Sequence, residues 1–402
     1  VNFNHNFHKY VKRECVCYDD GIKKVKDFIS VELPLDVPMS MLSFKQKLAV
    51  GLNVLSVWPS YLWSMKCSCE KYASKFKSPL IRWALTHVQT GPNNLFSMLY
   101  SYATVAEGDG GIPKGGSKPM AERIKHRFIE LGGTLKLNSS VKEINIEKGK
   151  CVGVTLSNNE IIKSDYVVTA LDPNYVINKL LLNQYPVSSI TRRFNNPRKH
   201  PCPSCCLLNF EVTDIPDLPI PFSFEVEPFK VGNENIFHLT LRSYAYDKEN
   251  FVIDNKTIMS VLLDQYSYDY EYWRALHNDK EEYLKIKKDI EFAVISRIIA
   301  KFPKLQDKIK LLDLATPYTL HRYTNATRGS YMGYCFTNKN SMFVHNGTVK
   351  GVKNLYLSSQ WLQSPGGLPL AIAEGKFAIQ RICKKENLSI LFDHPKKATV
   401  KN

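Results

Sequence analysis

Apolar residues recur with a helical period in one segment of the first half of the chain. Met120, Ile124, Phe128 and Leu131 are three or four positions apart, and a pair of glycines at 132–133 follows them. Residues at this spacing share one face of an α-helix, and glycine commonly ends a helix. The pattern therefore predicts an amphipathic helix that stops at the glycine pair.

Short runs that are typical of β-strands come next. They lie at 134–138, 141–147 and 151–157, and two asparagines at 158–159 predict a turn. The stretch at 165–173 is more continuously apolar and ends in Asp-Pro. It predicts a buried strand that is closed by a turn.

The remainder of the chain predicts a larger sheet with helices. The runs "SCCLLNFEV" at 204–212 and "NIFHLTLRSYA" at 235–245 favour strands, whereas 280–301 favours one long charged helix. We expect an antiparallel sheet covered by helices in this part. Near the C-terminus, a short strand is predicted at 354–359 and a helix at 370–384.

The charge of the chain restricts its partners. Of the 402 residues, 54 are Lys or Arg and 38 are Asp or Glu, so that the net charge is +16. Such an excess favours anionic partners. The sequence contains no arginine-rich arm, zinc-finger spacing or aromatic RNA-binding motif, so that we expect no nucleic-acid partner. A membrane surface is the better candidate for the anionic partner.

The apolar stretch at 48–63, "LAVGLNVLSVWPSYLW", is the segment that favours membrane contact. It is too short to span a bilayer and contains Pro59. It could lie on a bilayer, with Trp58, Tyr61 and Trp63 at the level of the head groups. The alternative is a buried helix or the wall of a substrate cavity.

The cysteines predict a reducing compartment. Paired cysteines can hold zinc, but the repeated C-x2-C spacing is absent. We therefore predict no metal site, reduced thiols and a cytoplasmic protein, with peripheral membrane contact as an option. The ten cysteines include three close groups: Cys15 and Cys17; Cys67 and Cys69; Cys202, Cys205 and Cys206.

The stretch "QWLQSPGGLPLAIAEGKFAI" at 360–379 looks like the opening of a helix without bulky side chains. Gly366 and Gly367 leave backbone N–H groups unshielded, and Pro369 suits a first helical turn. Such an N-terminus can hold a phosphate or the electron-rich edge of a ring. A tight strand-to-helix turn without a ligand explains the same spacing, and we expect Gly375 to allow close packing.

A second glycine-rich stretch lies at 108–116. It matches neither G-x-x-x-x-G-K-[ST] nor G-x-G-x-x-G, so that alone it predicts a flexible turn.

Four blocks of sequence together carry a resemblance. They are 108–144, 153–173, 315–334 and 354–379. In this order they resemble the FAD-dependent phytoene desaturase, carotenoid isomerase and retinol saturase family, within the amine-oxidase-like flavoprotein superfamily. The resemblance covers roughly 105–390.

The resemblance implies FAD as cofactor and an α/β fold of mixed α+β character. Its parts are a discontinuous, Rossmann-like FAD domain and a substrate domain with an antiparallel sheet, covering helices and an apolar tunnel. The implied segments are a substrate-domain or cap segment at 1–105, FAD-domain segments at 106–174 and 341–390, a substrate-domain segment at 175–340 and a tail at 391–402.

The family's motifs imply which residues lie near FAD. The closing strand-to-helix block would place Gln360, Gly366, Gly367, Leu368 and Pro369 along the flavin and its ribityl chain. The block "SSVKEI" would bring the backbone of Val141 to the adenine, and 111–116 would lie near the flavin or the tunnel. The family commonly has an acidic residue where this chain has Ser359-Gln360.

One family feature is missing. The family opens with a strand, a G-x-G-x-x-G turn and a helix, and nothing from Val1 to Gly108 matches them. We therefore expect an FAD domain that is incomplete at its N-terminus, most simply because the sequence starts late. The alternative is a functional protein without a flavin.

The function implied is desaturation, saturation or isomerisation of carbon–carbon double bonds in a hydrophobic polyene. His321 and Arg322 are the only candidates for catalytic roles that the sequence offers. A flavin amine oxidase is the first alternative, for which Tyr323, Tyr331 and Tyr334 could supply an aromatic cage. The second is a non-catalytic basic protein that binds lipid surfaces on a degenerate flavoprotein scaffold.

Overall fold

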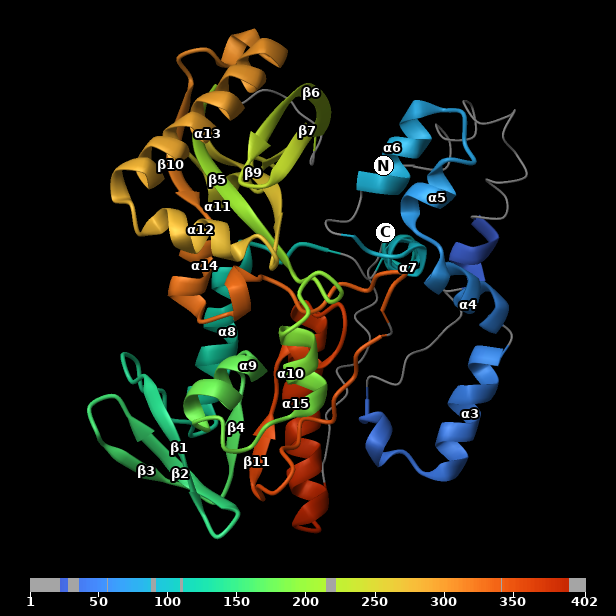
Figure 1. Ribbon diagram of the computed structural model, residues 1–402, viewed down its shortest axis with the longest axis vertical. Helices are drawn as coiled ribbons and strands as arrows, with labels where there is room; N and C mark the ends of the chain where they lie inside the picture. The colour runs from blue at the N-terminus through green and yellow to red at the C-terminus, as the bar shows by residue number, and fades with distance from the viewer. Residues whose placement is uncertain are drawn as a thin grey trace.

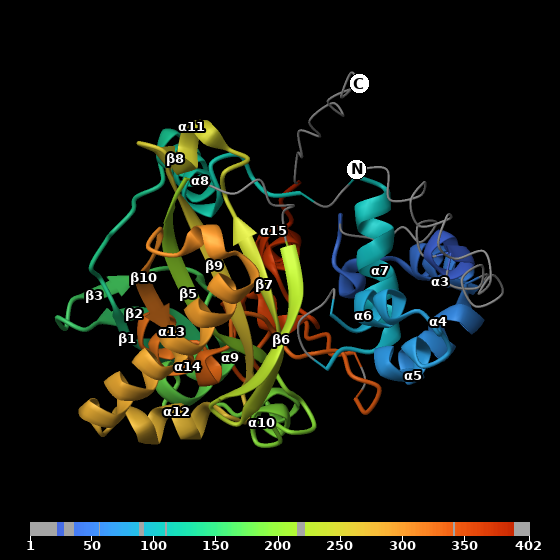
Figure 2. The ribbon, with the colours of Figure 1, turned by 90° about the horizontal axis from the view of Figure 1, so that it is seen from above.

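The computed structural model describes residues 22–27, 36–55, 57–87, 92–108, 111–214, 222–340 and 342–389. Figures 1 and 2 show a group of helices to one side of two β-containing units, which are a large antiparallel sheet and a smaller unit beside helix α15. The predicted tail at 391–402 and parts of the predicted segment at 1–105 lie outside the described residues. The predicted segment boundaries remain predictions.

The large sheet is antiparallel throughout. Its strand order is β10-β5-β9-β7-β6, and the short β8 pairs with β9. This confirms the predicted fold class. The bounds are β5 (Pro203–Thr213), β6 (Phe222–Val231), β7 (Glu234–Ser243), β8 (Val252–Ile253), β9 (Lys256–Tyr266) and β10 (Ile309–Ala315).

Helix α13 (Lys280–Lys301) covers this sheet, as the sequence predicts (Figure 1). Asp279 caps it by accepting a hydrogen bond from the Glu282 N–H at 3.1 Å. Its inward side chains, among them Val294 and Ile298, join one core with the strands. The other helices of this unit are α11 (Lys248–Phe251), α12 (Tyr270–His277) and α14 (Pro317–Thr324), and the short turns are η3 (Pro303–Leu305) and η4 (Thr327–Gly329).

The smaller unit contains two separate sheets. Strands β1, β2 and β3 form an antiparallel sheet, whereas β4 and β11 form a parallel pair. Helix α15 lies beside the pair (Figure 1). The bounds are β1 (Val141–Glu147), β2 (Lys150–Leu156), β3 (Ile161–Lys163), β4 (Val167–Thr169), α9 (Pro173–Tyr175), η2 (Val176–Leu180), α10 (Ser188–Phe194), β11 (Leu355–Leu357), η5 (Gln360–Leu362) and α15 (Leu368–Lys385).

The parallel part of this unit is small. Within the described residues it consists of two strands of three residues each. A parallel sheet in an α/β domain is normally wider and covered on both faces. Among the described residues, the parallel part of the Rossmann-like unit is therefore limited to the pair β4–β11, and the predicted incompleteness at the N-terminus stays a prediction.

The helical group has its own core. Tyr72, Leu95 and Met98 are almost completely buried within it. The side chain of Asn94 caps α7 by accepting a hydrogen bond from the Ser97 N–H at 3.1 Å. The elements are η1 (Met39–Met41), α3 (Phe44–Leu55), α4 (Trp58–Lys66), α5 (Cys69–Ala73), α6 (Pro79–His87) and α7 (Leu95–Ala106).

Two predicted elements differ in the structure. The helix expected from Met120 onward is α8 (Ser117–Glu130), but Ile124 and Phe128 on its apolar face are exposed. The strand predicted at 134–138 does not form, and this prediction was wrong. A strand exists only through pairing with a neighbour, and no described strand pairs with this segment.

Candidate functional site

The candidate site lies where the parallel strands end. Val167, Val168 and Thr169 of β4 pair in register with Leu355, Tyr356 and Leu357 of β11. Both strands therefore present their carboxyl ends at one edge. Ligands of open α/β sheets bind outside this edge.

Three polar atoms are buried near this edge without a partner. The Thr169 hydroxyl, the Ser359 hydroxyl and the Trp361 indole nitrogen have no hydrogen-bond partner among the described residues. Most buried polar groups in folded proteins are hydrogen-bonded, so that each exception calls for an explanation. A bound group with its own donors and acceptors would supply the missing partners.

The turn after β11 requires glycine. Gly366 and Gly367 have φ values of +87° and +99°, which L side chains rarely adopt. A Cβ on Gly366 would lie 2.7 Å from the Gly333 nitrogen, and a Cβ on Gly333 would lie 3.1 Å from the Gln360 carbonyl oxygen. Two segments of backbone therefore approach more closely than side chains would permit.

The side chain of Gln360 holds this turn together. Its Oε1 accepts a hydrogen bond from the Gly367 N–H at 2.9 Å, and its Nε2 donates to the Tyr331 carbonyl at 3.1 Å. The side chain is thus engaged with the protein at both ends. Gln360 therefore stabilises the glycine turn by linking it to the backbone of Tyr331.

Helix α15 begins directly at this turn. Gly367 occupies the N-cap, and Leu368 and Pro369 form the first two positions. Gly367 has no side chain to cap the helix, and the first turn contains no acidic residue. The positive end of the helix dipole therefore carries no protein anion of its own.

A buried carboxylate connects the segment after β4 to η4. Asp172 accepts hydrogen bonds from the Asn174 N–H at 2.8 Å and the Thr327 N–H at 2.6 Å. The Asn174 amide in turn donates to the hydroxyls of Thr327 and Tyr334. Burial raises the pKa of Asp172 and these hydrogen bonds oppose the rise. The sequence shows only the Asp-Pro turn and gives no sign of this contact.

A charged pair lies on the buried face of α15. Burial raises the pKa of Glu374 to about 7, and the Arg381 guanidinium, 3.8 Å away, offsets only part of this rise. Burial also lowers the pKa of His345, and the charge of Arg381 lowers it further. Within this pair, Glu374 is therefore the group whose protonation changes near neutral pH.

Gly375 does not have the role expected for it. A Cβ at this position would have the Ser358 hydroxyl oxygen as its nearest neighbour, at 4.0 Å, which is an ordinary contact. Close packing therefore does not explain the glycine, and this expectation was wrong.

The other site residues that the sequence predicts do not lie at the glycine turn. Val141 packs against the apolar cluster that contains Leu357, so that it shares a core with β11. His321 is on α14, and its Nδ1 lies 2.8 Å from the Ala326 carbonyl oxygen, whereas Arg322 is exposed and stacks over Tyr323. No described contact brings these two residues to the glycine turn.

The loop predicted near the flavin or the tunnel contacts residues of the predicted substrate-domain segment at 175–340. The Gly115 N–H donates to the Asp247 carboxylate at 2.9 Å, and a Cβ on Gly116 would lie 3.2 Å from the ring of Phe251. These partners precede or belong to α11. Positions 109–110 of the loop lie outside the described residues.

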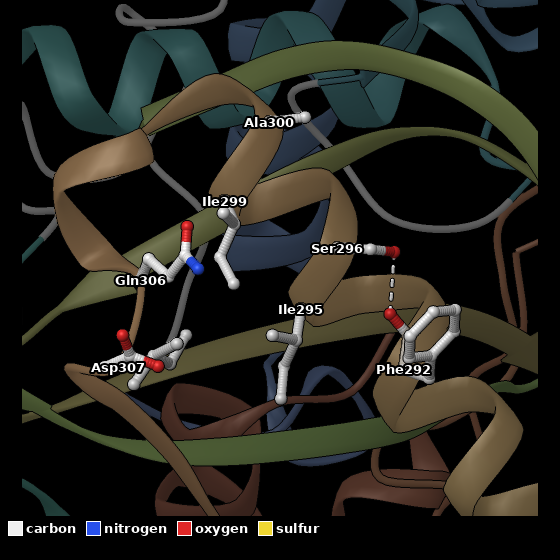
Figure 3. Close-up of a pocket in the computed structure, with 8 residues that line it drawn as sticks. Phe292, Ile295, Ser296, Ile299, Ala300, Gln306 and Asp307 are labelled. Atoms are coloured by element: carbon white, nitrogen blue, oxygen red, sulfur yellow. Dashed lines mark hydrogen bonds between the residues drawn. The ribbon is translucent and has the colours of Figure 1, made fainter.

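Two hollows lie away from the glycine turn. A groove of about 590 Å³ runs along α13, with Phe292, Ile295 and Ile299 on one side and Gln306 and Asp307 at its rim (Figure 3). It contains no cluster of titratable groups that would mark it as a catalytic site. A second hollow of about 290 Å³ lies between α6 and the β6–β7 hairpin, and its lining includes Trp83, Phe237 and His238.

The described residues fit a bound flavin nucleotide at the edge of β4 and β11. The unpartnered buried hydroxyls of Thr169 and Ser359 suit a polyhydroxy chain. The glycine turn and the α15 N-terminus suit an electron-rich or anionic group. These residues are brought together by strand pairing and not by their spacing in the sequence.

The sequence model of one protein family matches most of this chain. The model for flavin containing amine oxidoreductases matches residues 41–383. The chain belongs to this flavoprotein family. Membership confirms the predicted superfamily and the predicted flavin cofactor, FAD.

Individual relatives of this flavoprotein are distant. The phytoene desaturases of Fusarium fujikuroi and Gibberella fujikuroi are each 23% identical over 317 residues, which cover 71% of this chain and 53% of the relative. The chain thus spans about half the length of the curated relatives it matches. An oxidoreductase from Methanosarcina mazei has a similar fold, with a TM-score of 0.50 and 14% identity over 89% of this chain and 75% of that one.

Two further predictions concern membranes and metals. Among the described residues, no helix has both the length and the hydropathy that crossing a membrane requires. Nor do three or more potential metal ligands of the His, Cys, Asp or Glu type gather anywhere in the part of the chain that the structure describes. Cys202, Cys205 and Cys206 are buried as free thiols, and burial raises the pKa of each.

Proposed function

We propose that this chain acts as an FAD-dependent oxidoreductase that desaturates, saturates or isomerises carbon–carbon double bonds of a hydrophobic polyene. The observation that carries the proposal is the set of unpartnered hydroxyls and glycines at the edge of β4 and β11 in a chain of this family. The distant similarity to phytoene desaturases supports the polyene as substrate class.

Each part of the site would have a separate task. A bound FAD supplies hydride or electron transfer, while the protein provides position and shielding from water. Thr169 and Ser359 would bind its polar chain, Gln360 would keep the glycine turn in place, and Asp172 would hold the end of β4 against η4. The apolar hollow beside Trp83 and Phe237 would belong to the substrate side.

Amine oxidation is the alternative that the family name supports. It would require an aromatic cage, for which Tyr323, Tyr331 and Tyr334 are the candidates. Tyr323 is 75% exposed on α14, whereas Tyr334 is buried and within hydrogen-bonding distance of Asn174. The exposure of Tyr323 does not suit a cage beside a buried flavin, and we therefore prefer the polyene proposal.

The test is reconstitution followed by anaerobic reduction. The chain would be mixed with excess FAD, freed of unbound FAD and examined for visible flavin absorbance. We expect retained oxidised flavin to be bleached by a polyene in detergent micelles if the reaction is desaturation. If the reaction is saturation, we expect flavin that has been reduced beforehand to be reoxidised by the polyene. An amine should do neither. A colourless protein would contradict flavin binding, and bleaching by amines alone would contradict the substrate class.

A further inference from the structure

Helix α3 carries an exposed apolar stripe. Phe44, Leu48, Leu52 and Leu55 are 81%, 53%, 56% and 59% exposed. Since successive residues of an α-helix are about 100° apart, these four side chains fall within an arc of roughly 80°. They form one continuous stripe along the helix.

The stripe faces away from the rest of the protein. Val50 is the least exposed residue of α3 for which burial is described, and it lies on the helix face opposite the stripe. Figures 1 and 2 place α3 on the outer side of the helical group, away from both sheets. The helix therefore packs against the rest of the protein with the face that contains Val50.

Positive charge borders the stripe on both sides. Lys45 and Lys47 are exposed, and at 100° per residue Lys45 lies about 20° beyond one edge of the stripe and Lys47 about 60° beyond the other. The sequence of α3 contains no acidic residue. An apolar face with lysines along its borders is typical of helices that lie in the plane of a membrane surface.

Helix α4, which follows α3 in the chain, also has exposed apolar residues. Trp58 and Leu62, one turn apart, are 45% and 42% exposed, and Trp58 stacks on Tyr61 with ring centroids 5.4 Å apart. Tryptophan and tyrosine favour the head-group region of a bilayer because one part of each ring system is apolar and another is polar. From position 38 to 83 the only acidic residue is Glu70, against Lys45, Lys47, Lys66, Lys71, Lys75, Lys77 and Arg82.

We propose that α3 and the start of α4 dock the protein on the surface of an anionic lipid bilayer. The helix would lie in the plane of the surface, because no described helix meets the requirements for crossing it. Charge complementarity favours lipid over a second copy of the chain as the occupant. A second copy would bring the same lysines and the same net charge of +16 to the contact.

Vesicle flotation tests this docking independently of flavin binding and activity. The chain would be mixed with phosphatidylcholine vesicles that contain or lack phosphatidylglycerol. The stripe variant is L48E/L52E, and the matched control is L284E/F292E, which places the same charges on exposed apolar positions of α13. Circular dichroism would verify that both variants are folded.

We expect the chain to float with the anionic vesicles and the stripe variant to bind them at least tenfold more weakly, while the control binds like the unaltered chain. The variant K45Q/K47Q should lose most of the preference for phosphatidylglycerol. Equal flotation of the stripe variant and the unaltered chain would overturn the proposal. So would association of the chain with itself, in the absence of vesicles, that L48E/L52E abolishes.

Discussion

Gly333 and Gly366 lie backbone against backbone, with so little space that a Cβ on Gly366 would come within 2.7 Å of the Gly333 nitrogen. The two residues are 33 positions apart and belong to different blocks of the sequence. Their contact joins the segment after η4 to the turn that begins α15. It fixes the position of the helix N-terminus that we assign to the flavin.

The first prediction concerns Gly366→Ala. A side chain at φ +87° costs about 1–2 kcal/mol, and forcing a methyl group into a packed space adds about 1–3 kcal/mol. We expect a loss of about 2–5 kcal/mol in the free energy of unfolding and a large loss of FAD retention. Urea unfolding and flavin absorbance after gel filtration would measure the two effects.

Gly132→Ala is the matched control for this variant. Gly132 has the same φ of +87°, but nothing lies within 4 Å of the position that its Cβ would take. The control should therefore show only the conformational cost and retain FAD as the unaltered chain does. Equal losses in both variants would mean that the contact between the two glycines has no role of its own.

The second prediction concerns Asp172→Ala. The change leaves the buried N–H groups of Asn174 and Thr327 without their acceptor. Each such group costs about 1–3 kcal/mol, so that for the two groups together we expect a loss of roughly 2–6 kcal/mol in the free energy of unfolding. Chemical denaturation would measure it.

Asp279→Ala provides the comparison for Asp172→Ala. Asp279 also accepts a backbone hydrogen bond as a helix cap, but it is exposed and its partner Glu282 is three positions away. Loss of an exposed cap costs about 1 kcal/mol. A loss for Asp172→Ala no larger than this would show that the connection between the two units contributes little.

Elements that depend on nearby residues could be predicted from the sequence. The bounds of α13 agree with the prediction because Asp279 caps its start and apolar residues recur with a helical period along it. Strands β1, β2 and β5 likewise match their predicted runs, since alternation and a turn pair such as Asn158-Asn159 are local signals. The resemblance to flavoproteins also rests on such continuous blocks.

Features that depend on distant residues could not be predicted. The bond from Thr327 to Asp172 joins positions 155 apart in the sequence. The hydrogen bond from the Gln360 side chain to the Tyr331 carbonyl likewise forms only because the fold brings these two residues together. The failed strand at 134–138 has the same cause, because its own residues suit a strand but do not provide a partner.

The third prediction concerns Gly375→Ala. Gly375 lies inside α15, where glycine costs about 1 kcal/mol relative to alanine, and an added methyl group would make only an ordinary contact. We expect the free energy of unfolding to rise by about 0.5–1 kcal/mol, measured by urea unfolding without FAD. A destabilised variant would instead indicate that α15 packs more tightly on β11 than the contact distance implies.

The fourth prediction concerns the pH dependence that Glu374 introduces. Its folded pKa of about 7 is above the ordinary value of 4.5, so that the folded state binds more protons than the unfolded state between these values. Stability from this group is therefore fully present below about pH 4.5 and is lost as the pH rises to about 7. At 1.36 kcal/mol per pKa unit, the loss is on the order of 3 kcal/mol.

Glu374→Gln isolates this contribution from those of other carboxyl groups. Glutamine resembles the protonated acid in shape and cannot ionise, so that the variant should lose less stability than the unaltered chain between pH 5 and pH 8. Urea unfolding at both pH values gives the difference, and Glu122→Gln, at a partly exposed site on α8, controls for a change in net charge. Parallel pH profiles for the unaltered chain and Glu374→Gln would mean that the folded state does not raise the pKa of Glu374, because a group with the same pKa in the folded and unfolded states leaves the profile unchanged.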